Sequence, residues 1–175
     1  MSLRDYVYCG LLASSLVHKS ANIATTQLKC GKYCRIDAFV TITGDVTLGD
    51  YVHVGVGACL FGTHGITIGD GVSISPGAKI FSASEDVDSE LVSNPQVMTR
   101  NFLHGAVRIG RLAVVGANSV VLPGASIGDE SVVGALSLVK GGQWIAHRDI
   151  VAGAPSRYIR ARIRVNKFLT FGGKL

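Results

Sequence analysis

The sequence predicts a single all-β domain, a coil of short parallel strands with three strands in each turn. Three observations support this prediction. Aliphatic residues or cysteines recur every six residues, glycine occupies 22 of the 175 positions, and 17% of the residues are charged, against about 25% in an ordinary soluble domain. A period of six fits neither an amphipathic helix nor a simple strand meander. Each anchor residue would point into a narrow core, with glycine or another small residue at each corner.

The coil is expected over residues 21–155, after an N-terminal extension at residues 1–20. Its anchors are Cys30, Ile36, Ile42, Leu48, Val54, Leu60, Ile68, Ile74, Ile80, Ile109, Val115, Val121, Ile127, Val133 and Val139. A two-residue insertion lies between Leu60 and Ile68, and the register is lost between Ile80 and Ile109. The polar, acidic stretch at about residues 82–106 is therefore expected as a long external loop, and such loops are usually functional or disordered.

The C-terminal part of the chain, residues 156–175, is expected to form an α-helix from Arg157 to Phe171 and a tail. This end is basic. Residues 140–175 hold eight cations and one acid, a balance of +7, whereas residues 1–139 hold nine cations and eleven acids, a balance of −2. Either an anionic partner or a solvated helix face accounts for this segregation. Nucleic acid is not expected as a partner, because Tyr158 is the one aromatic residue interleaved with the arginines.

The sequence points to a cytoplasmic protein without a membrane partner. Its four cysteines form no CxxC pair, which favours reduced thiols over a disulfide framework or a zinc ribbon. The longest uncharged run, residues 112–128, contains a proline, three glycines and polar residues, and it is not expected to span a bilayer. Residues 4–17 imitate a secretory signal weakly, without a small-x-small cleavage motif before Lys19.

The last third of the chain carries a more specific pattern, IGRLAVVGANSVVLPGASIGDESVVGALSLVKG followed by VAGAPSRYIR. It resembles the signature region of sugar acetyltransferases of the hexapeptide-repeat family, including the galactoside and maltose enzymes. The segments RIDAFVTI, IFSASEDVDSE, SNP and GALSLV are most similar to the branch of nucleotide-linked amino-sugar N-acetyltransferases, such as the dTDP-4-amino-4,6-dideoxyglucose type. The resemblance covers about residues 15–165. It implies a left-handed parallel β-helix, although parallel crossovers are right-handed in about 98% of cases.

The resemblance also implies a function: transfer of acetyl from acetyl-CoA, in a homotrimer and without a metal, to the amine of a nucleotide-linked sugar for surface polysaccharide synthesis. O-acetylation of a sugar or glycoside hydroxyl is an alternative, and a non-catalytic β-helix assembly protein is another. The γ-type carbonic anhydrases share the fold but bind zinc through three histidines. His53, His64 and His104 lack the closely spaced pair that such a site requires.

The resemblance places coenzyme A in a groove between neighbouring subunits, toward the C-terminal coils. The residues that map onto this groove are Gly116, Ala117, Ala135 and Ser137 for the pantetheine arm, Lys140, Arg157 and Arg160 for the phosphates, and Pro155 and Ile159 for the adenine. Small residues let a ligand approach the backbone closely, and basic residues match an anionic cofactor. Plain coil geometry accounts equally well for each small residue taken singly.

The expected proton acceptor is Glu85. The galactoside and maltose enzymes have a histidine at the position that Glu85 occupies in IFSASED. A carboxylate is a weak base toward a hydroxyl but can accept a proton from an ammonium group, which favours an amino-sugar acceptor over a solvated loop carboxylate. His53, in the YVH turn, is the second catalytic candidate, because a neighbouring subunit would bring it to Glu85. Candidate substrate-binding residues are His64, expected beside Ser84, and the loop residues Asp86, Asp88 and Asn94.

Overall fold

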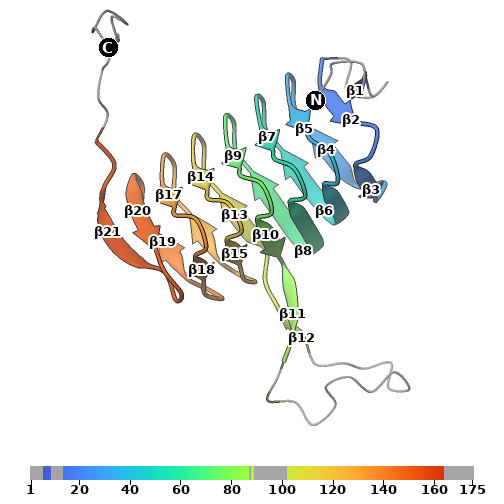
Figure 1. Ribbon diagram of the computed structural model, residues 1–175. Helices are drawn as coiled ribbons and strands as arrows, with labels where there is room; N and C mark the ends of the chain where they lie inside the picture. The colour runs from blue at the N-terminus through green and yellow to red at the C-terminus, as the bar shows by residue number, and fades with distance from the viewer. Residues whose placement is uncertain (1–5, 9–13, 87, 89–101, 164–175) are drawn as a thin grey trace, which may run out of the picture.

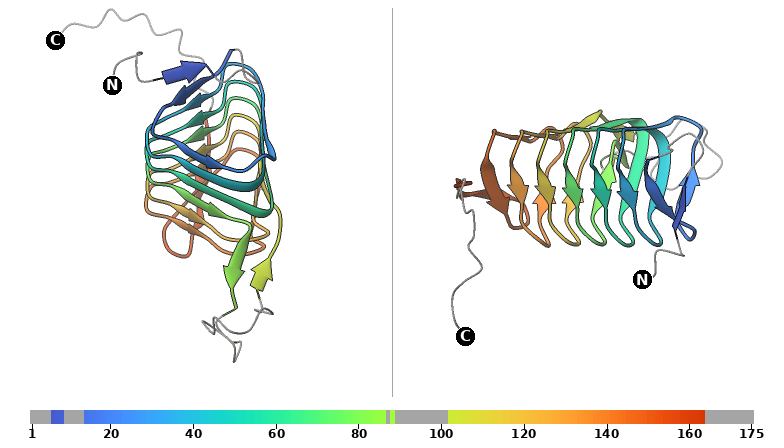
Figure 2. Two further views of the ribbon diagram at one scale, coloured as in Figure 1. Left: turned by 90° about the vertical axis from the view of Figure 1, so that its right-hand side faces the viewer. Right: turned by 90° about the horizontal axis from the view of Figure 1, so that it is seen from above.

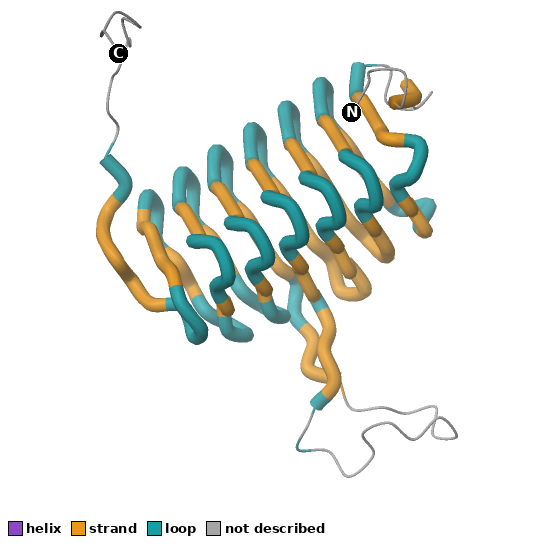
Figure 3. Tube along the Cα trace, viewed as in Figure 1, coloured by secondary structure: helices purple, strands orange, loops and turns teal. Residues whose placement is uncertain are grey.

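The computed structural model describes residues 6–8, 14–86, 88 and 102–163. It confirms the parallel coil. Short strands repeat along the chain, separated by tight corners, and successive turns stack into a three-sided solenoid (Figures 1 and 2). The described residues contain strands, loops and turns but no helix (Figure 3).

One face of the solenoid is a nine-stranded sheet, here called sheet A. In spatial order its strands are β1 (Tyr6–Tyr8), β2 (Leu16–His18), β5 (Arg35–Ile36), β7 (His53–Val54), β9 (Ser73–Ile74), β14 (Val114–Val115), β17 (Val132–Val133), β20 (Asp149–Ala152) and β21 (Arg157–Ala161). From β2 to β20 all neighbours are parallel, and β1 and β21 pair antiparallel at the two ends. Residues at equivalent positions of successive coils, such as Arg35, His53 and Ser73, therefore lie side by side.

The other two faces belong to sheet B, which is continuous around one corner because β6 and β8 are long enough to turn it. Its strands are β3 (Asn22–Ala24), β4 (Leu28–Cys30), β6 (Thr41–Leu48), β8 (Cys59–Ile68), β10 (Lys79–Phe81), β13 (Val107–Ile109), β15 (Val120–Val121), β16 (Ser126–Ile127), β18 (Leu138–Val139) and β19 (Trp144–Ile145). The pairing of β8 absorbs the two-residue insertion as an irregularity of register beside β6.

The core of the solenoid consists of the anchors that the six-residue period predicts. Fourteen of the fifteen are at most 2% exposed. Cys30 is the exception and is half-buried, because it lies in the first coil, where no complete turn covers it. Burial of an aliphatic side chain contributes roughly 1.5–3 kcal/mol, so the row of anchors is the main stabilising element of the fold.

Aspartates join successive coils at one corner. Lys32 N donates to Asp50 Oδ1 (2.7 Å), and Arg111 N donates to Asp129 Oδ1 (2.8 Å). Arg111 also pairs with Asp129 through its guanidinium and lowers the pKa of that carboxyl. The glycine before each donor leaves the space for the carboxylate. A Cβ atom on Gly110 would collide with Asp129 and lie 2.7 Å from the carbonyl carbon of Gly128.

The structure differs from the sequence-based expectations at both ends of the coil. The first coil begins at Leu16, inside the expected N-terminal extension, because β2 pairs in parallel with β5. At the other end the expected helix is wrong for Arg157–Ala161, which form β21 against β20. The open edge of β20 offers unpaired backbone groups, and an added strand satisfies them where a helix would not. Residues 164–171 of the expected helix lie outside the described residues.

A two-stranded hairpin projects from the coil where the external loop was expected (Figure 1). Its strands, β11 (Ala83–Glu85) and β12 (Phe102–His104), are antiparallel. The chain leaves the coil at Ser82 and returns at Gly105, whose N–H donates to the carbonyl of Ser82 (3.0 Å). The hairpin thus starts and ends at a single point of the coil.

Candidate active site

The hairpin presents the acidic residues that the sequence analysis singled out. Glu85 ends β11 and is exposed opposite Phe102. Asp86 follows it, and its Oδ1 accepts a hydrogen bond from the backbone N–H of Asp88 (3.1 Å). Glu85, Asp86 and Asp88 therefore lie together at the outer end of the described hairpin. The fourth candidate of this loop, Asn94, lies outside the described residues.

His64 lies at the root of the hairpin. Its ring stacks on His104, with centroids 4.7 Å apart and an interplanar angle of 23°. Its backbone N–H donates to the hydroxyl of Ser82 (2.8 Å), and this buried hydroxyl donates in turn to the carbonyl of Phe61 (3.0 Å). His104 pairs with Ala83, two residues before Glu85. The expected neighbourhood of His64 is thus observed as a contact with His104 and Ser82 rather than with Ser84.

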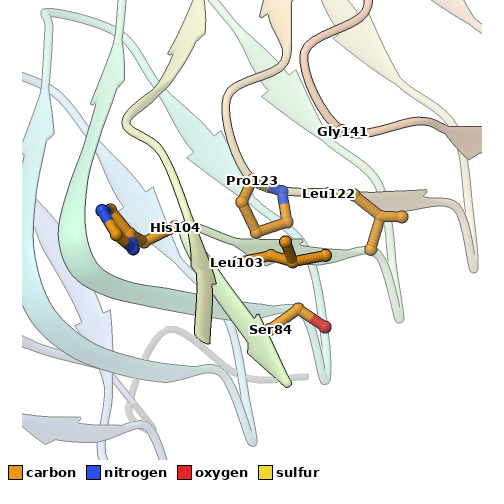
Figure 4. Close-up of a pocket in the computed structure, with 6 residues that line it drawn as sticks. All are labelled: Ser84, Leu103, His104, Leu122, Pro123 and Gly141. Carbon is orange, nitrogen blue, oxygen red and sulfur yellow. The ribbon is translucent and has the colours of Figure 1, made fainter. Parts of the chain in front are cut away.

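Between the hairpin and the coil lies a hollow of about 350 Å³. Ser84, Leu103 and His104 line it from the hairpin, and Leu122, Pro123 and Gly141 line it from two successive coils (Figure 4). The walls are mainly aliphatic, with the Ser84 hydroxyl and the His104 ring as polar groups. A short apolar chain fits such a hollow, one residue away from Glu85.

The residues of this hollow were missed at the level of sequence, although a signal was present. Ile80 pairs with Val121, so Leu122 and Pro123 lie in the coil next to the point where the hairpin departs. The stacking of coils predicts this neighbourhood. The path of the hairpin over the corner cannot be derived from the six-residue period, because the hairpin does not follow that period.

His53 lies on a different face from the hairpin. It begins β7 of sheet A, in register with Arg35 of β5. Its Nε2 is 2.8 Å from Oδ2 of Asp37, a carboxylate whose side chain is 5% exposed. Arg35 pairs with the same carboxylate through Nε and Oδ1 (3.0 Å). Asp37 was not identified from the sequence, although its distance of 16 residues from His53 is close to one coil.

The expected coenzyme A residues gather at the C-terminal end of the solenoid. Gly116 and Gly134 follow the paired strands β14 and β17, Ala152 ends β20, and Arg157 of β21 pairs with Ala152. Arg157 therefore extends the row that begins at Gly116. Ala117 and Ala135 follow at the next corner, while Pro155, Ile159 and Arg160 are exposed at the end of the coil.

Gln143 ties Lys140 to the turn before β21. Its Oε1 accepts hydrogen bonds from the N–H of Lys140 (3.0 Å) and from the hydroxyl of Ser156 (3.2 Å), and its Nε2 donates to the carbonyl of Ser156 (3.3 Å). Lys140 thus lies near Arg157, the residue that follows Ser156. This arrangement brings together two cations that are 17 residues apart in the sequence.

Coil geometry accounts for two of the small residues in this set. A Cβ atom on Gly116 would lie 2.7 Å from the carbonyl oxygen of Val133, so glycine is required by packing alone. The hydroxyl of Ser137 is buried; it accepts from the N–H of Gly153 (3.1 Å) and donates to the carbonyl of Ala135 (3.3 Å). Ala117 and Ala135 take part through their backbone carbonyls, which accept from the N–H of Leu136 (2.9 Å) and from the Ser137 hydroxyl respectively.

Two further observations concern the described residues as a whole. No helix among them is long and apolar enough to cross a membrane. In the same part of the chain, no three histidine, cysteine, aspartate or glutamate side chains gather as a metal site would require.

Comparison with known proteins agrees with this architecture. Residues 106–135 match a family model described as the hexapeptide repeat of succinyl-transferase. The chain is similar to AntD, an N-acyltransferase from Bacillus cereus solved with dTDP and 3-hydroxybutyryl-CoA. The two are 31% identical with a TM-score of 0.81, over 86% of this chain and 81% of AntD. This similarity confirms the left-handed parallel β-helix.

Two further relatives share the repeat or the fold. The carnitine operon protein CaiE of Salmonella agona (strain SL483) is 38% identical over 128 residues, 71% of this chain. The match covers 64% of that protein, so this chain spans less than two thirds of it. The acetyltransferase domain of PglB from Neisseria gonorrhoeae, solved with acetyl coenzyme A, is 20% identical with a TM-score of 0.65, over 83% of this chain and 58% of that one. At that identity the likeness concerns the fold.

Proposed function

Because the chain belongs to the hexapeptide-repeat acyltransferase family, we propose that it transfers acetyl from coenzyme A to the amine of a nucleotide-linked sugar. One observation carries this proposal: a hairpin with a carboxylate, Glu85, overhangs an aliphatic hollow of about 350 Å³. A short acyl chain fits the hollow, and an ammonium group fits the carboxylate. The likeness to AntD supports the substrate class, since one AntD variant was solved with dTDP-4-amino-4,6-dideoxyglucose and coenzyme A.

Coenzyme A is proposed to lie along the C-terminal coils. Lys140, Arg157 and Arg160 would bind its phosphates, and Pro155 and Ile159 would flank its adenine. The pantetheine arm would follow the backbone at Gly116, Ala117, Ala135 and Ser137. The row from Gly116 to Arg157 and the link through Gln143 support this assignment. No metal is part of the proposal.

The chemistry is direct transfer in a ternary complex. Glu85 accepts a proton from the sugar ammonium group, and the free amine attacks the thioester carbonyl. The carbon–nitrogen bond forms, the carbon–sulfur bond breaks, and coenzyme A leaves as a thiol. His64, Asp86, Asp88 and Asn94 are proposed to bind the sugar nucleotide around the hairpin.

We propose that the active unit is a homotrimer. Glu85 extends from the hairpin beyond sheet B, whereas His53 lies on sheet A. Contact between the hairpin of one subunit and sheet A of the next would unite the two catalytic candidates. Sedimentation equilibrium at working concentrations is expected to give three times the chain mass of 18.3 kDa. We place the reaction in the cytoplasm, on a precursor of a surface polysaccharide.

The proposed function is tested with the full chain, acetyl-CoA and matched acceptors. Thiol release with dTDP-4-amino-4,6-dideoxyglucose is expected to exceed that with dTDP-glucose, and mass spectrometry should show one added acetyl group per sugar. Preference for the neutral sugar would favour O-acylation instead. No coenzyme-A-dependent product with any of a panel of nucleotide-linked amino sugars would contradict the proposal.

Replacement of Lys140 or Arg157 by alanine is expected to raise the KM for acetyl-CoA about tenfold or more, with little change in kcat. A charge-assisted contact contributes roughly 1.5–3 kcal/mol, and a phosphate contact made equally in the ground and transition states affects binding alone. Initial rates at varied acetyl-CoA measure the effect. Arg108→Ala, which removes an exposed cation from sheet B, is the matched control. An unchanged KM in both variants would leave the basic end as a solvated surface.

A further inference from the structure

A buried carboxylate lies beside His53, and it is already balanced by a cation. Arg35 approaches Asp37 through two contacts, Nε to Oδ1 (3.0 Å) and Nη2 to Oδ2 (3.3 Å). A buried carboxylate needs such a partner to offset its lost hydration. Because Arg35 supplies it, the additional contact of His53 with Oδ2 is not required to neutralise Asp37. The contact between His53 and Asp37 therefore acts mainly on the protonation and orientation of the imidazole.

This contact selects one tautomer of His53. Nε2 lies 2.8 Å from Asp37 Oδ2 and 2.8 Å from Arg35 Nη2. An unprotonated Nε2 would direct its lone pair at the carboxylate oxygen, whereas a protonated Nε2 donates a charge-assisted hydrogen bond to it. Arg35 can only donate, so its Nη2 must turn away from a protonated Nε2; the half-exposed side chain can do so and still hold Asp37 through Nε, whereas the buried carboxylate cannot turn away. Nε2–H is therefore the favoured form, and the lone pair resides on Nδ1.

The remaining surroundings leave Nδ1 available. Among the described residues no hydrogen bond to Nδ1 is formed, and 35% of the His53 side chain is exposed. The charged groups that face His53 are Arg35 of β5 and Asp37 of the corner that follows β5. On the other side, β9 contributes Ser73, which carries no charge in this pH range.

We propose that Asp37 is a positioning residue, which holds His53 with Nδ1 turned outward as the proton carrier of the acyl-transfer step. This inference rests on the proposed function. After the amine has attacked the thioester, its nitrogen must lose a proton and the departing sulfur must gain one. Nδ1 of His53 takes the proton from nitrogen and returns it to sulfur, so the imidazole ends the cycle neutral. Glu85 acts earlier, on the free ammonium group.

Asp37→Asn tests the assignment. An amide keeps the size of the side chain but can donate to Nε2 and so favour the other tautomer, which in a serine-protease triad costs about 10⁴-fold in kcat. Here we expect a loss in kcat of about 10²-fold or more, with both KM values within about threefold of wild type. His53→Gln should lose at least as much, and the double variant no more than His53→Gln alone. Asp129→Asn, which also removes a carboxylate paired with an arginine, is the matched control.

A second measurement does not depend on turnover. In the full chain with ¹⁵N-labelled histidine, assigned by comparison with His53→Gln, long-range ¹H–¹⁵N correlation should show His53 protonated at Nε2. Protonation at Nδ1 in the wild type would overturn the assignment even if Asp37→Asn does not fold. A wild type that turns over, with Asp37→Asn within twofold of it or His53→Gln fully active, would overturn it as well. A wild type without acyl transfer would contradict the proposed function itself.

Discussion

Glu85→Gln is expected to lower turnover with an amino-sugar acceptor by about 10²–10⁴-fold at neutral pH. The amide cannot accept a proton, so an ammonium substrate stays unreactive in the site. The loss should shrink as the pH rises, because above its own pKa the sugar amine needs no proton acceptor before it attacks. Rates of thiol release from pH 6 to pH 10, at saturating acetyl-CoA, measure both effects.

The control for this prediction distinguishes the loss of a negative charge from the loss of the proton acceptor. Asp45→Asn removes an exposed carboxylate from the corner between the two halves of β6 and should leave the profile unchanged. A Glu85→Gln variant that is fully active at pH 7 would contradict the role of Glu85. A loss that stays constant up to pH 10 would indicate a hydroxyl acceptor, since a hydroxyl gains no comparable reactivity in that range.

Gly110→Ala is expected to destabilise the folded chain by about 3 kcal/mol or more. The added methyl group would collide with Asp129 and with the carbonyl carbon of Gly128, 2.7 Å away. A rotation of the Asp129 side chain cannot relieve the clash with the backbone of Gly128. At roughly 2–4 °C per kcal/mol for a chain of this size, the Tm should fall by about 6–12 °C, as measured by circular dichroism.

Gly57→Ala is the matched control for this clash. Gly57 has a φ of +66°, so alanine there carries a conformational cost of roughly 1–2 kcal/mol, but its Cβ atom would meet no atom within 4 Å. We therefore expect a fall in Tm well below that of Gly110→Ala. Equal falls in the two variants would mean that backbone freedom rather than coil stacking sets the requirement for glycine.

The sequence predicts the solenoid well because each six-residue repeat of the coil contributes one anchor to the core. Ile36, Val54 and Ile74 follow one another across sheet A, so the register of the coil can be read from the spacing of aliphatic residues. The same arithmetic places Arg35 beside His53. It does not predict that Asp37 turns its carboxylate toward the imidazole, because that depends on the corner after Ile36.

Two parts of the structure do not follow from the sequence pattern. The segment after Pro155 alternates arginine with Tyr158 and Ile159 in a way that suits either a helix or a strand. The choice depends on the open edge of β20, a feature of the finished sheet. Similarly, the hollow under the hairpin forms from Leu103 and Leu122, which lie in segments with different periods and meet because β10 stacks beside β15.

The hydrogen bond between Gly105 and Ser82 closes the base of the hairpin, so the insert can change without changing the path of the coil. Lengthening a loop whose ends are fixed costs little, about 0.6 kcal/mol for each doubling, and β10 and β13 keep their own partners in sheet B. The segment between Ser82 and Gly105 is thus free to diverge in length and composition while the solenoid stays the same. Under the proposed function, an exchange of this one insert would change the acceptor, while the coils that line the other side of the hollow, at Leu122, Pro123 and Gly141, would keep their place.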